Sequence, residues 1–283
     1  MKSSGQEMAA SSIDTALQAL IERLQPVASS AGYFYPLNGL TGLSGKVVCG
    51  QQCWLARRIP HQPIPFISRR REWHLLRGLT ASGLAPHALA IDRRWLLLEW
   101  LPGETLAEGE FLARQSELVT LLTRLHHQPL SGYRLQLLPL LHHYWQQCRQ
   151  RNPRWLRRLR QLARQGEPLP LRLGLLHMDI HPGNLLAHPD GLRLIDWEYA
   201  ADGDIALELA AIISGNGLNA AQRATLLADY ACSNRLDLRA LKRQVRLWQP
   251  WLHLLMASWY QLRWEQSGDS ALHQRAIAAW RQI

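Results

Sequence analysis

Lysine is scarce in this chain. Only Lys2, Lys46 and Lys242 are lysines, so 29 of the 32 basic residues are arginines, and the formal net charge is +10. Such a basic surface can serve an anionic small molecule or a nucleic acid. The arginine-rich stretch "RNPRWLRRLRQLARQ" (151–165) leaves nucleic-acid binding open as an alternative. A solvated helix face explains this stretch better, and we expect no nucleic-acid partner.

Cysteine and long apolar runs are also rare. Cys49, Cys53, Cys148 and Cys232 show neither a metal-ligand spacing nor the density of a disulfide framework, so we expect free buried thiols. No run reaches the roughly 18–20 apolar residues that a membrane-spanning helix needs. The start, "MKSSGQEMAASSIDTAL", lacks the apolar segment of a secretory signal. These absences predict a cytoplasmic location and no membrane partner.

Strand patterns are concentrated in the first hundred residues. Residues 1–11 lack periodicity and are expected to be disordered. After them, the pattern predicts a helix over 12–26, a Gly-punctuated hairpin over 33–60, a helix over 66–86 and two strands over 88–101. Pro102 and Gly103 then break the last strand.

The rest of the chain has mainly helical periodicity. It predicts helices near 110–127, 137–165 with a break at Pro153, 204–214, 220–232, 237–266 and 269–282, with short apolar strands between 171 and 197. We therefore predict an α+β fold with a strand-rich lobe over 1–100 and a helical lobe over 101–283. A ligand cleft is expected between two such unlike lobes.

The stretch "LLHMDIHPGNLLAHPDGLRLIDWEYA" (175–200) contains the spacing H-x-D-x-x-x-x-N, followed by an aspartate after an apolar run. This spacing is typical of the catalytic loop of a kinase and its metal-binding aspartate. Phosphoryl transfer requires positioning and charge neutralisation more than covalent chemistry. Asp179 fits the group that accepts the proton of the attacking hydroxyl. Asn184 and Asp196 offer the hard oxygen ligands that Mg²⁺ prefers.

The same stretch resembles the aminoglycoside phosphotransferase and choline kinase family, small-molecule relatives of the protein kinases. "LLPLLHHYWQQ" (137–147), "RQVRLWQPWLHLLMASWYQLRW" (243–264), "GLSG" (42–45) and "RIPHQP" (58–63) are similar to family members that phosphorylate thiamine. The resemblance covers most of the chain from about residue 35 and is strongest in the second lobe. It implies a bilobal protein-kinase-like fold, ATP as co-substrate and a small alcohol as acceptor. That acceptor is thiamine, or alternatively choline or an aminoglycoside, and we expect a monomer.

The protein-kinase-like fold that the resemblance implies also predicts residues that bind the nucleotide. Gly42 and Gly45 lie in a Gly-rich hairpin where backbone can approach phosphates, although it fits neither G-x-x-x-x-G-K-[ST] nor G-x-G-x-x-G. In "WLARRIP", alternation places Ala56 and Arg58 on one face of a strand, as in V-A-I-K. The match at "RIPH" also favours Arg58 over Arg57 as the phosphate cation. Glu72 in the next helix is its expected partner, and backbone groups from Glu99 to Leu101 are the expected adenine contacts.

A cationic acceptor such as thiamine needs aromatic faces and carboxylates. The residues predicted to contact it are Glu198, as the acid nearest the acceptor, together with Trp197 and Tyr144. Asp204 is an alternative acid, but it can instead cap the helix that follows it.

Overall fold

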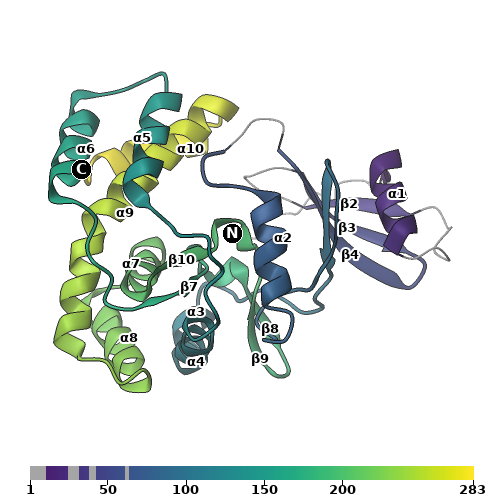
Figure 1. Ribbon diagram of the computed structural model, residues 1–283, viewed down its shortest axis with the longest axis horizontal. Helices are drawn as coiled ribbons and strands as arrows, with labels where there is room; N and C mark the ends of the chain where they lie inside the picture. Colours follow the sequence, from purple (N-terminus) through teal and green to yellow (C-terminus); the bar gives the residue numbers. More distant parts are fainter. Residues whose placement is uncertain (1–10, 25–31, 38–42, 61–63) are drawn as a thin grey trace.

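The first part of the chain forms an antiparallel sheet of six strands, on the right of Figure 1. The computed structural model describes residues 11–24, 32–37, 43–60 and 64–283. The strand order is β1-β2-β3-β4-β6-β5. These strands are β1 (Ser11–Ser12), β2 (Tyr33–Leu37), β3 (Ser44–Cys49), β4 (Gln52–Arg58), β5 (Ala88–Ile91) and β6 (Trp95–Glu99). The disorder predicted for 1–11 is wrong at Ser11, which pairs with Phe34, while residues 1–10 lie outside the described part.

The two faces of this sheet are covered by different helices. Leu97 of β6 lies in the cluster that contains α1 (Thr15–Leu24), together with Val47, Trp54 and Ala56. Its neighbours Leu96 and Leu98 lie in the larger cluster with α2 (Arg69–Gly78). This follows from the two-residue repeat of a strand, which points successive side chains to opposite faces. The face with α2 is turned toward the helical part of the molecule (Figure 1).

The second part of the chain is mainly helical. Its long helix α9 (Leu238–Ser267) packs against α5, α7, α8 and α10. The helices of this part are α3 (Glu110–Ala113), α4 (Gln115–His126), α5 (Leu137–Gln147), α6 (Pro153–Gln165), α7 (Ile205–Gly215), α8 (Ala220–Ser233), α9 and α10 (Ser270–Trp280). The predicted break at Pro153 is confirmed, because α6 begins there with Asn152 as its N-cap.

Short strands lie between these helices. β7 (Leu173–Leu176) pairs with β10 (Ala201–Asp204), and β8 (Leu185–His188) pairs with β9 (Gly191–Leu194). One-turn 3₁₀ helices, η1 (Pro182–Asn184) and η2 (Trp197–Tyr199), follow β7 and β9. The sequence pattern missed β10, whose residues "ADGD" are poor strand formers. Asp204 is the N-cap of α7, because its side chain accepts a hydrogen bond from the backbone N–H of Ala206. Asp204 therefore has the capping role that the sequence offered as the alternative to an acceptor contact.

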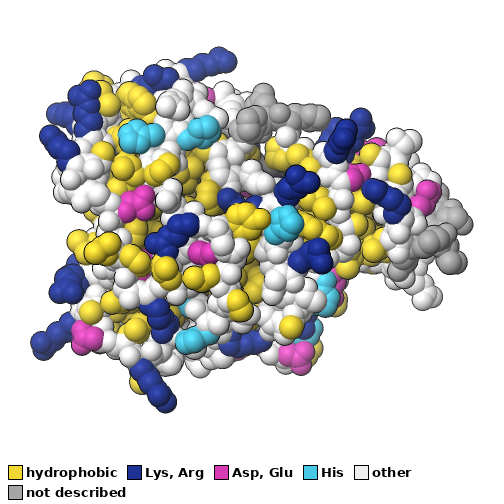
Figure 2. Space-filling model, in the orientation of Figure 1, with side chains coloured by type: hydrophobic (Ala, Val, Ile, Leu, Met, Phe, Trp, Pro, Cys, Tyr) yellow, Lys and Arg dark blue, Asp and Glu magenta, His cyan; other side chains and the backbone are white. Residues whose placement is uncertain are grey.

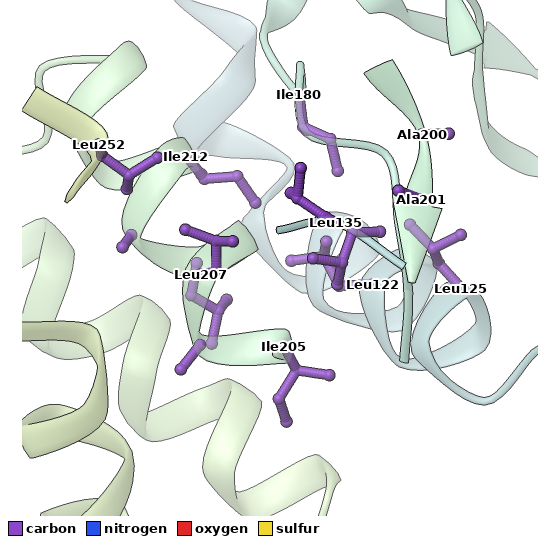
Figure 3. Packing of buried hydrophobic residues seen from close by; sticks show 14 of the residues in the cluster. Leu122, Leu125, Leu135, Ile180, Ala200, Ala201, Ile205, Leu207, Ile212 and Leu252 are labelled. Carbon is purple, nitrogen blue, oxygen red and sulfur yellow. The ribbon is translucent and has the colours of Figure 1, made fainter. Parts of the chain in front are cut away.

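A continuous apolar core lies beneath the loop after β7. Figure 3 shows part of it, where Ile180 from that loop lies with Leu135, Leu122, Ile205 and Ile212. All of these side chains are buried. The polar residues on either side of Ile180 are therefore carried by a segment whose position is set by packing.

The surface of α6 explains its arginine-rich sequence. Trp155, Leu159 and Leu162 are buried, whereas Arg154, Arg157, Arg160 and Arg164 are exposed. Figure 2 shows Lys and Arg side chains over much of the visible face and its rim. The pattern is that of a surface helix with one apolar side.

The predicted α+β fold is confirmed. The four cysteines are free, as predicted, but only Cys49 and Cys148 are buried, and Cys232 is exposed. Within the described residues, no helix combines the length and apolar character needed to cross a membrane.

Candidate active site

The loop after β7 begins with His177, which anchors it from the inside. His177 is fully buried, its Nε2–H donates to the carbonyl of Ile195 at 3.0 Å, and its ring packs edge-on against Trp197. Burial lowers the pKa of His177, which favours the neutral imidazole. His177 therefore ties the loop to the segment that carries Asp196.

Asp179 and Asn184 face each other across this loop. The Nδ2 group of Asn184 donates to the carboxylate Oδ2 of Asp179 at 3.0 Å and to its backbone carbonyl at 2.9 Å. Burial, followed by the nearby charges of Asp196 and Glu198, raises the pKa of Asp179 to about 7. A carboxylate of that basicity can take up a proton near neutral pH.

Asp196 lies just after β9 in a left-handed backbone conformation, with φ 65°. Its side chain is 37% exposed, and its Oδ1 lies 2.6 Å from Nη2 of Arg57. Burial would raise the pKa of Asp196, but the ion pair with Arg57 outweighs it and holds that pKa below its ordinary value. Asp196 is therefore an ionised carboxylate at neutral pH.

The cation that meets Glu72 is Arg57, not Arg58. Nη1 of Arg57 lies 2.7 Å from Oε1 of Glu72, and both side chains are buried. Arg58 is half-buried and forms no ion pair with any residue that the structure describes. The prediction failed because Ala56 was taken to mark the inner face of β4. Ala56 instead packs in the cluster of α1, so the residues on the inner face are Leu55 and Arg57.

Trp197 differs from its predicted position, whereas Glu198 lines the cavity described below and is also paired with arginines. Only 2% of the Glu198 side chain is exposed, and its Oε2 lies 2.7 Å from both Arg57 and Arg69. Glu198 is thus an internal partner of two arginines. Trp197 is buried, donates its Nε1–H to the carbonyl of Leu194 and does not line the cavity described below. Tyr144 is also buried, but it does line that cavity.

The predicted nucleotide-binding residues lie in different surroundings. Gly42 falls outside the described residues. Gly45 lies in β3, where a Cβ atom would overlap the ring of Phe34, so packing alone already requires glycine there. Glu99 ends β6, and its Oε2 accepts from the backbone N–H of His87. The backbone N–H and C=O of Leu101 form no hydrogen bond with the described part of the chain, which leaves them available for a ligand.

An open cavity of about 970 Å³ brings the polar loop residues next to an aromatic wall. Asp179, Asn184 and Asp196 line one part of it. The facing residues come from α5, η2 and α9 and are mainly aromatic or apolar: Tyr144, Tyr199, Leu252, Met256, Trp259 and Tyr260. The cavity can therefore hold a partly apolar ligand beside Asp179.

The donor set in this cavity fits a magnesium ion that is bound together with a nucleotide. The amide oxygen of Asn184 accepts no hydrogen bond from the described residues, and Asp196 is partly exposed. The described residues contain no cluster of three His, Cys, Asp or Glu side chains able to hold a metal by themselves. An ion at Asn184 and Asp196 would therefore take its other ligands from phosphate oxygens and water, as Mg²⁺ commonly does.

Sequence reasoning missed three residues of this site. Arg69 was not among the predicted site residues, yet it is three residues before Glu72 and shares its helix face. Glu208 is an acid within the apolar run "IALELAA", and it accepts hydrogen bonds from the backbone of His177 and Met178. Tyr199 follows Glu198 and lines the cavity. A charge inside an apolar helix is the signal that could have found Glu208.

The sequence profile of the phosphotransferase enzyme family matches residues 46–248. The chain belongs to this family. Among curated relatives of this phosphotransferase, a thiamine kinase of Escherichia coli is 43% identical over 257 residues, covering 88% of this chain and 91% of the relative. A thiamine kinase of Salmonella typhimurium is 47% identical over 248 residues, covering 87% and 88% of the two chains.

Solved structures agree with the fold of the family. The choline kinase LicA from Streptococcus pneumoniae in complex with AMP has a TM-score of 0.73 at 18% identity, covering 92% of this chain and 95% of the other. A choline/ethanolamine kinase family protein from Mesorhizobium loti has a TM-score of 0.71 at 20% identity, covering 94% and 92%. The predicted protein-kinase-like fold and the predicted enzyme class, an ATP-dependent small-molecule kinase, are confirmed at the level of the family.

Proposed function

We propose that this phosphotransferase transfers the γ-phosphoryl group of ATP to the hydroxyl of thiamine, giving thiamine monophosphate. The observation that carries the proposal is the 43–47% identity to thiamine kinases over almost the whole of both chains. A match of that extent necessarily includes the polar loop and α5. The aromatic wall supports the proposal, because thiamine presents a cationic ring that aromatic faces attract.

In the proposed reaction, the acceptor hydroxyl oxygen attacks the γ-phosphorus. The new O–P bond forms as the bond to the bridging oxygen of ADP breaks, and ADP leaves. Asp179 accepts the hydroxyl proton at its carboxylate, for which a pKa of about 7 is suitable. Asn184 orients Asp179 through its Nδ2 group.

Asn184 and Asp196 are the proposed magnesium ligands, and Arg57 is the proposed phosphate cation in place of Arg58. A bound magnesium ion supplies charge neutralisation at the phosphates. Backbone groups near Leu101 are the proposed adenine contacts. The Trp197 role is not proposed again, whereas Tyr144 and Glu198 remain proposed acceptor contacts because both line the cavity.

An acceptor panel tests the proposal. Purified protein is assayed with ATP and Mg²⁺ against thiamine, choline, ethanolamine and an aminoglycoside, and the product is identified by mass. We expect thiamine to have the highest kcat/KM. Preferential phosphorylation of another alcohol would replace the acceptor, and absence of turnover with thiamine would refute the proposal.

The role of Asp179 is tested with Asp179→Asn. We expect kcat to fall by about 10²–10⁴-fold, the usual contribution of a positioned general base, while ATP affinity stays nearly constant. The matched control is Asp190→Asn in the turn of the neighbouring β8–β9 hairpin, where the side chain is 81% exposed. Wild-type kcat in Asp179→Asn would show that another group accepts the proton.

A further inference from the structure

Four buried side chains close a ring of ion pairs between the sheet, α2 and the turn after β9. Nη1 of Arg57 lies 2.7 Å from Glu72 Oε1, and Glu72 Oε2 lies 2.8 Å from Nη1 of Arg69. Nη1 of Arg69 also lies 2.7 Å from Glu198 Oε2, which lies 2.7 Å from Nη2 of Arg57. The exposed fractions of these side chains are 5% or less. The ring therefore links three segments that are far apart in the sequence.

The ring balances charge around Arg57. It contains two arginines and two glutamates, and Asp196 bonds to Arg57 from outside it. Without Arg69, the carboxylates of Glu72 and Glu198 would lose one of the two guanidinium groups that they share in the ring. Removing one partner of a buried ion pair leaves an uncompensated charge, which is costly in a poorly solvated site. Arg57 would then no longer be held between Glu72 and Asp196 by balanced contacts.

The backbone of Glu198 is fixed from the same helix. Nη2 of Arg71 donates to the backbone carbonyl of Glu198 at 2.8 Å, and the Arg71 guanidinium stacks on the Phe66 ring. Helix α2 thus contacts η2 both through the backbone carbonyl of Glu198 and through the Glu198 carboxylate. Because η2 begins directly after Asp196, these contacts also restrict where Asp196 can lie.

We infer that Arg69 and Glu198 are positioning residues of the nucleotide site, which hold the Arg57 guanidinium against Asp196. This inference rests on the proposed nucleotide roles of Arg57 and Asp196, and it is independent of which alcohol is the acceptor. Arg69 and Glu198 act through Arg57. Losing either one weakens the binding of ATP with magnesium, and because Arg69 does not line the cavity, its loss leaves the acceptor side largely unchanged.

Arg57 and Arg69 use different atoms in the ring, so substitution by lysine should have different effects at the two positions. Arg69 reaches both glutamates through the single nitrogen Nη1, and its buried Nε and Nη2 form no hydrogen bond with the residues that the structure describes. A lysine ammonium can supply such a point charge. Arg57 instead uses Nη1 for Glu72 and Nη2 for Glu198 and Asp196, so its planar fork is required. Lysine is therefore tolerated at position 69 and not at position 57.

The experiment measures ATP affinity of the full chain by calorimetry, with and without Mg²⁺, and steady-state KM for ATP and for the acceptor. The variants are Arg69→Met, Arg69→Lys, Arg57→Lys and Glu198→Gln. The matched control is Arg70→Met, because Arg70 is the exposed neighbour of Arg69 and takes no part in the ring. We expect Arg69→Met and Glu198→Gln to weaken ATP binding with Mg²⁺ by roughly 10–100-fold, as loss of a supporting partner commonly does. The acceptor KM of Arg69→Met should change by less than about threefold, and Arg69→Lys should recover most of the lost affinity.

Each outcome decides the inference. Equal ATP affinity in Arg69→Met and Arg70→Met overturns it, as does a rise in acceptor KM in place of the ATP effect. If Arg69→Met does not fold, Arg69→Lys and Arg57→Lys carry the test, and equal loss in the two refutes the atom-level assignment. The proposed function fails separately, when wild-type protein binds ATP but does not phosphorylate thiamine. Wild-type protein that binds no ATP overturns both.

Discussion

The carboxylate of Glu208 accepts a 2.6 Å hydrogen bond from the backbone N–H of Met178, a residue held at the left-handed φ of 67°. The same carboxylate accepts from the backbone N–H of His177 at 3.0 Å, and its Oε2 lies 3.1 Å from Nε2 of His126. A positive φ at a residue with a side chain costs about 1–3 kcal/mol and persists only where the surroundings impose it. Glu208, fully buried in α7, imposes that conformation one residue before Asp179.

Replacing Glu208 by Gln should loosen this bend. Only one end of the amide can accept hydrogen bonds, so one of the buried donors loses its partner, which costs about 1–3 kcal/mol of unfolding free energy. We expect kcat to fall as well, because Asp179 is no longer held in place. Denaturant unfolding and steady-state kinetics measure the two effects. Glu117→Gln, an exposed acid on α4, is the matched control, and equal behaviour of the two variants would refute the role of Glu208.

Acid pH should destabilise the fold through His177. Burial lowers the pKa of this side chain, so the unfolded chain takes up a proton at about pH 6.5 whereas the folded chain does so only at lower pH. The unfolded state then binds more protons below that pH, and the stabilising contribution, complete above it, is lost as the pH falls.

The measurement is the unfolding free energy from pH 8 to pH 5 for wild type and His177→Gln. The variant should be less stable at pH 8. On acidification its unfolding free energy should fall less steeply than that of wild type, and the difference in slope should correspond to the uptake of up to one proton on unfolding. His74→Gln, an exposed histidine of α2, should follow the wild-type curve. Parallel curves for wild type and His177→Gln would show that His177 does not contribute to the acid sensitivity.

The loop that carries Asp179 and Asn184 could be predicted from the sequence, whereas the long-range contacts that hold this loop in place could not. Asp179 and Asn184 are five residues apart, so local turn geometry brings them together. The side of β4 that faces the site depends on which face meets α1, and a small residue such as Ala56 packs equally well on either face. Because of that ambiguity, the cation was predicted at Arg58, one residue away from Arg57. A one-residue shift exchanges the faces of a strand.

Long-range partners of buried charges are the least predictable part of the site. Glu198 was predicted as the acid nearest the acceptor because a cationic acceptor needs carboxylates. Its partner Arg69 is 129 residues away in the chain, so only the packing of α2 against η2 reveals the pair. Packing decides which side chains such an acid contacts, and residue spacing carries no information about that packing.

Gly45 provides a test of packing against nucleotide binding. A Cβ atom at this position would overlap the ring of Phe34, which is buried against α1, so Gly45→Ala should lower the unfolding free energy by about 1–3 kcal/mol. Phe34→Leu removes part of the ring, so the double variant should lose less stability than the sum of the single variants. A rise in KM for ATP without any loss of stability in Gly45→Ala would instead favour the nucleotide role predicted for this glycine.

The hydrogen bond between Trp259 and Tyr199 should set the affinity for the acceptor. The Nε1–H of Trp259 donates to the Tyr199 hydroxyl at 2.8 Å, and both rings line the cavity beside Asp179. Burial raises the pKa of Tyr199 well above its ordinary value, so the hydroxyl stays protonated and can itself donate to a ligand. Trp259→Phe removes the group that fixes this hydroxyl, and we expect KM for thiamine to rise about 3–10-fold, the loss of roughly one ordinary hydrogen bond.

KM for ATP should remain unchanged in Trp259→Phe, since the nucleotide residues lie on other elements. Tyr199→Phe should give a similar shift, and the double variant should be no worse than either single one, because the pair acts as a unit. Trp280→Phe is the matched control: it also removes an indole hydrogen bond, to Gln261, but does not line the cavity. Additive effects of Trp259→Phe and Tyr199→Phe would show that each ring contacts the acceptor independently.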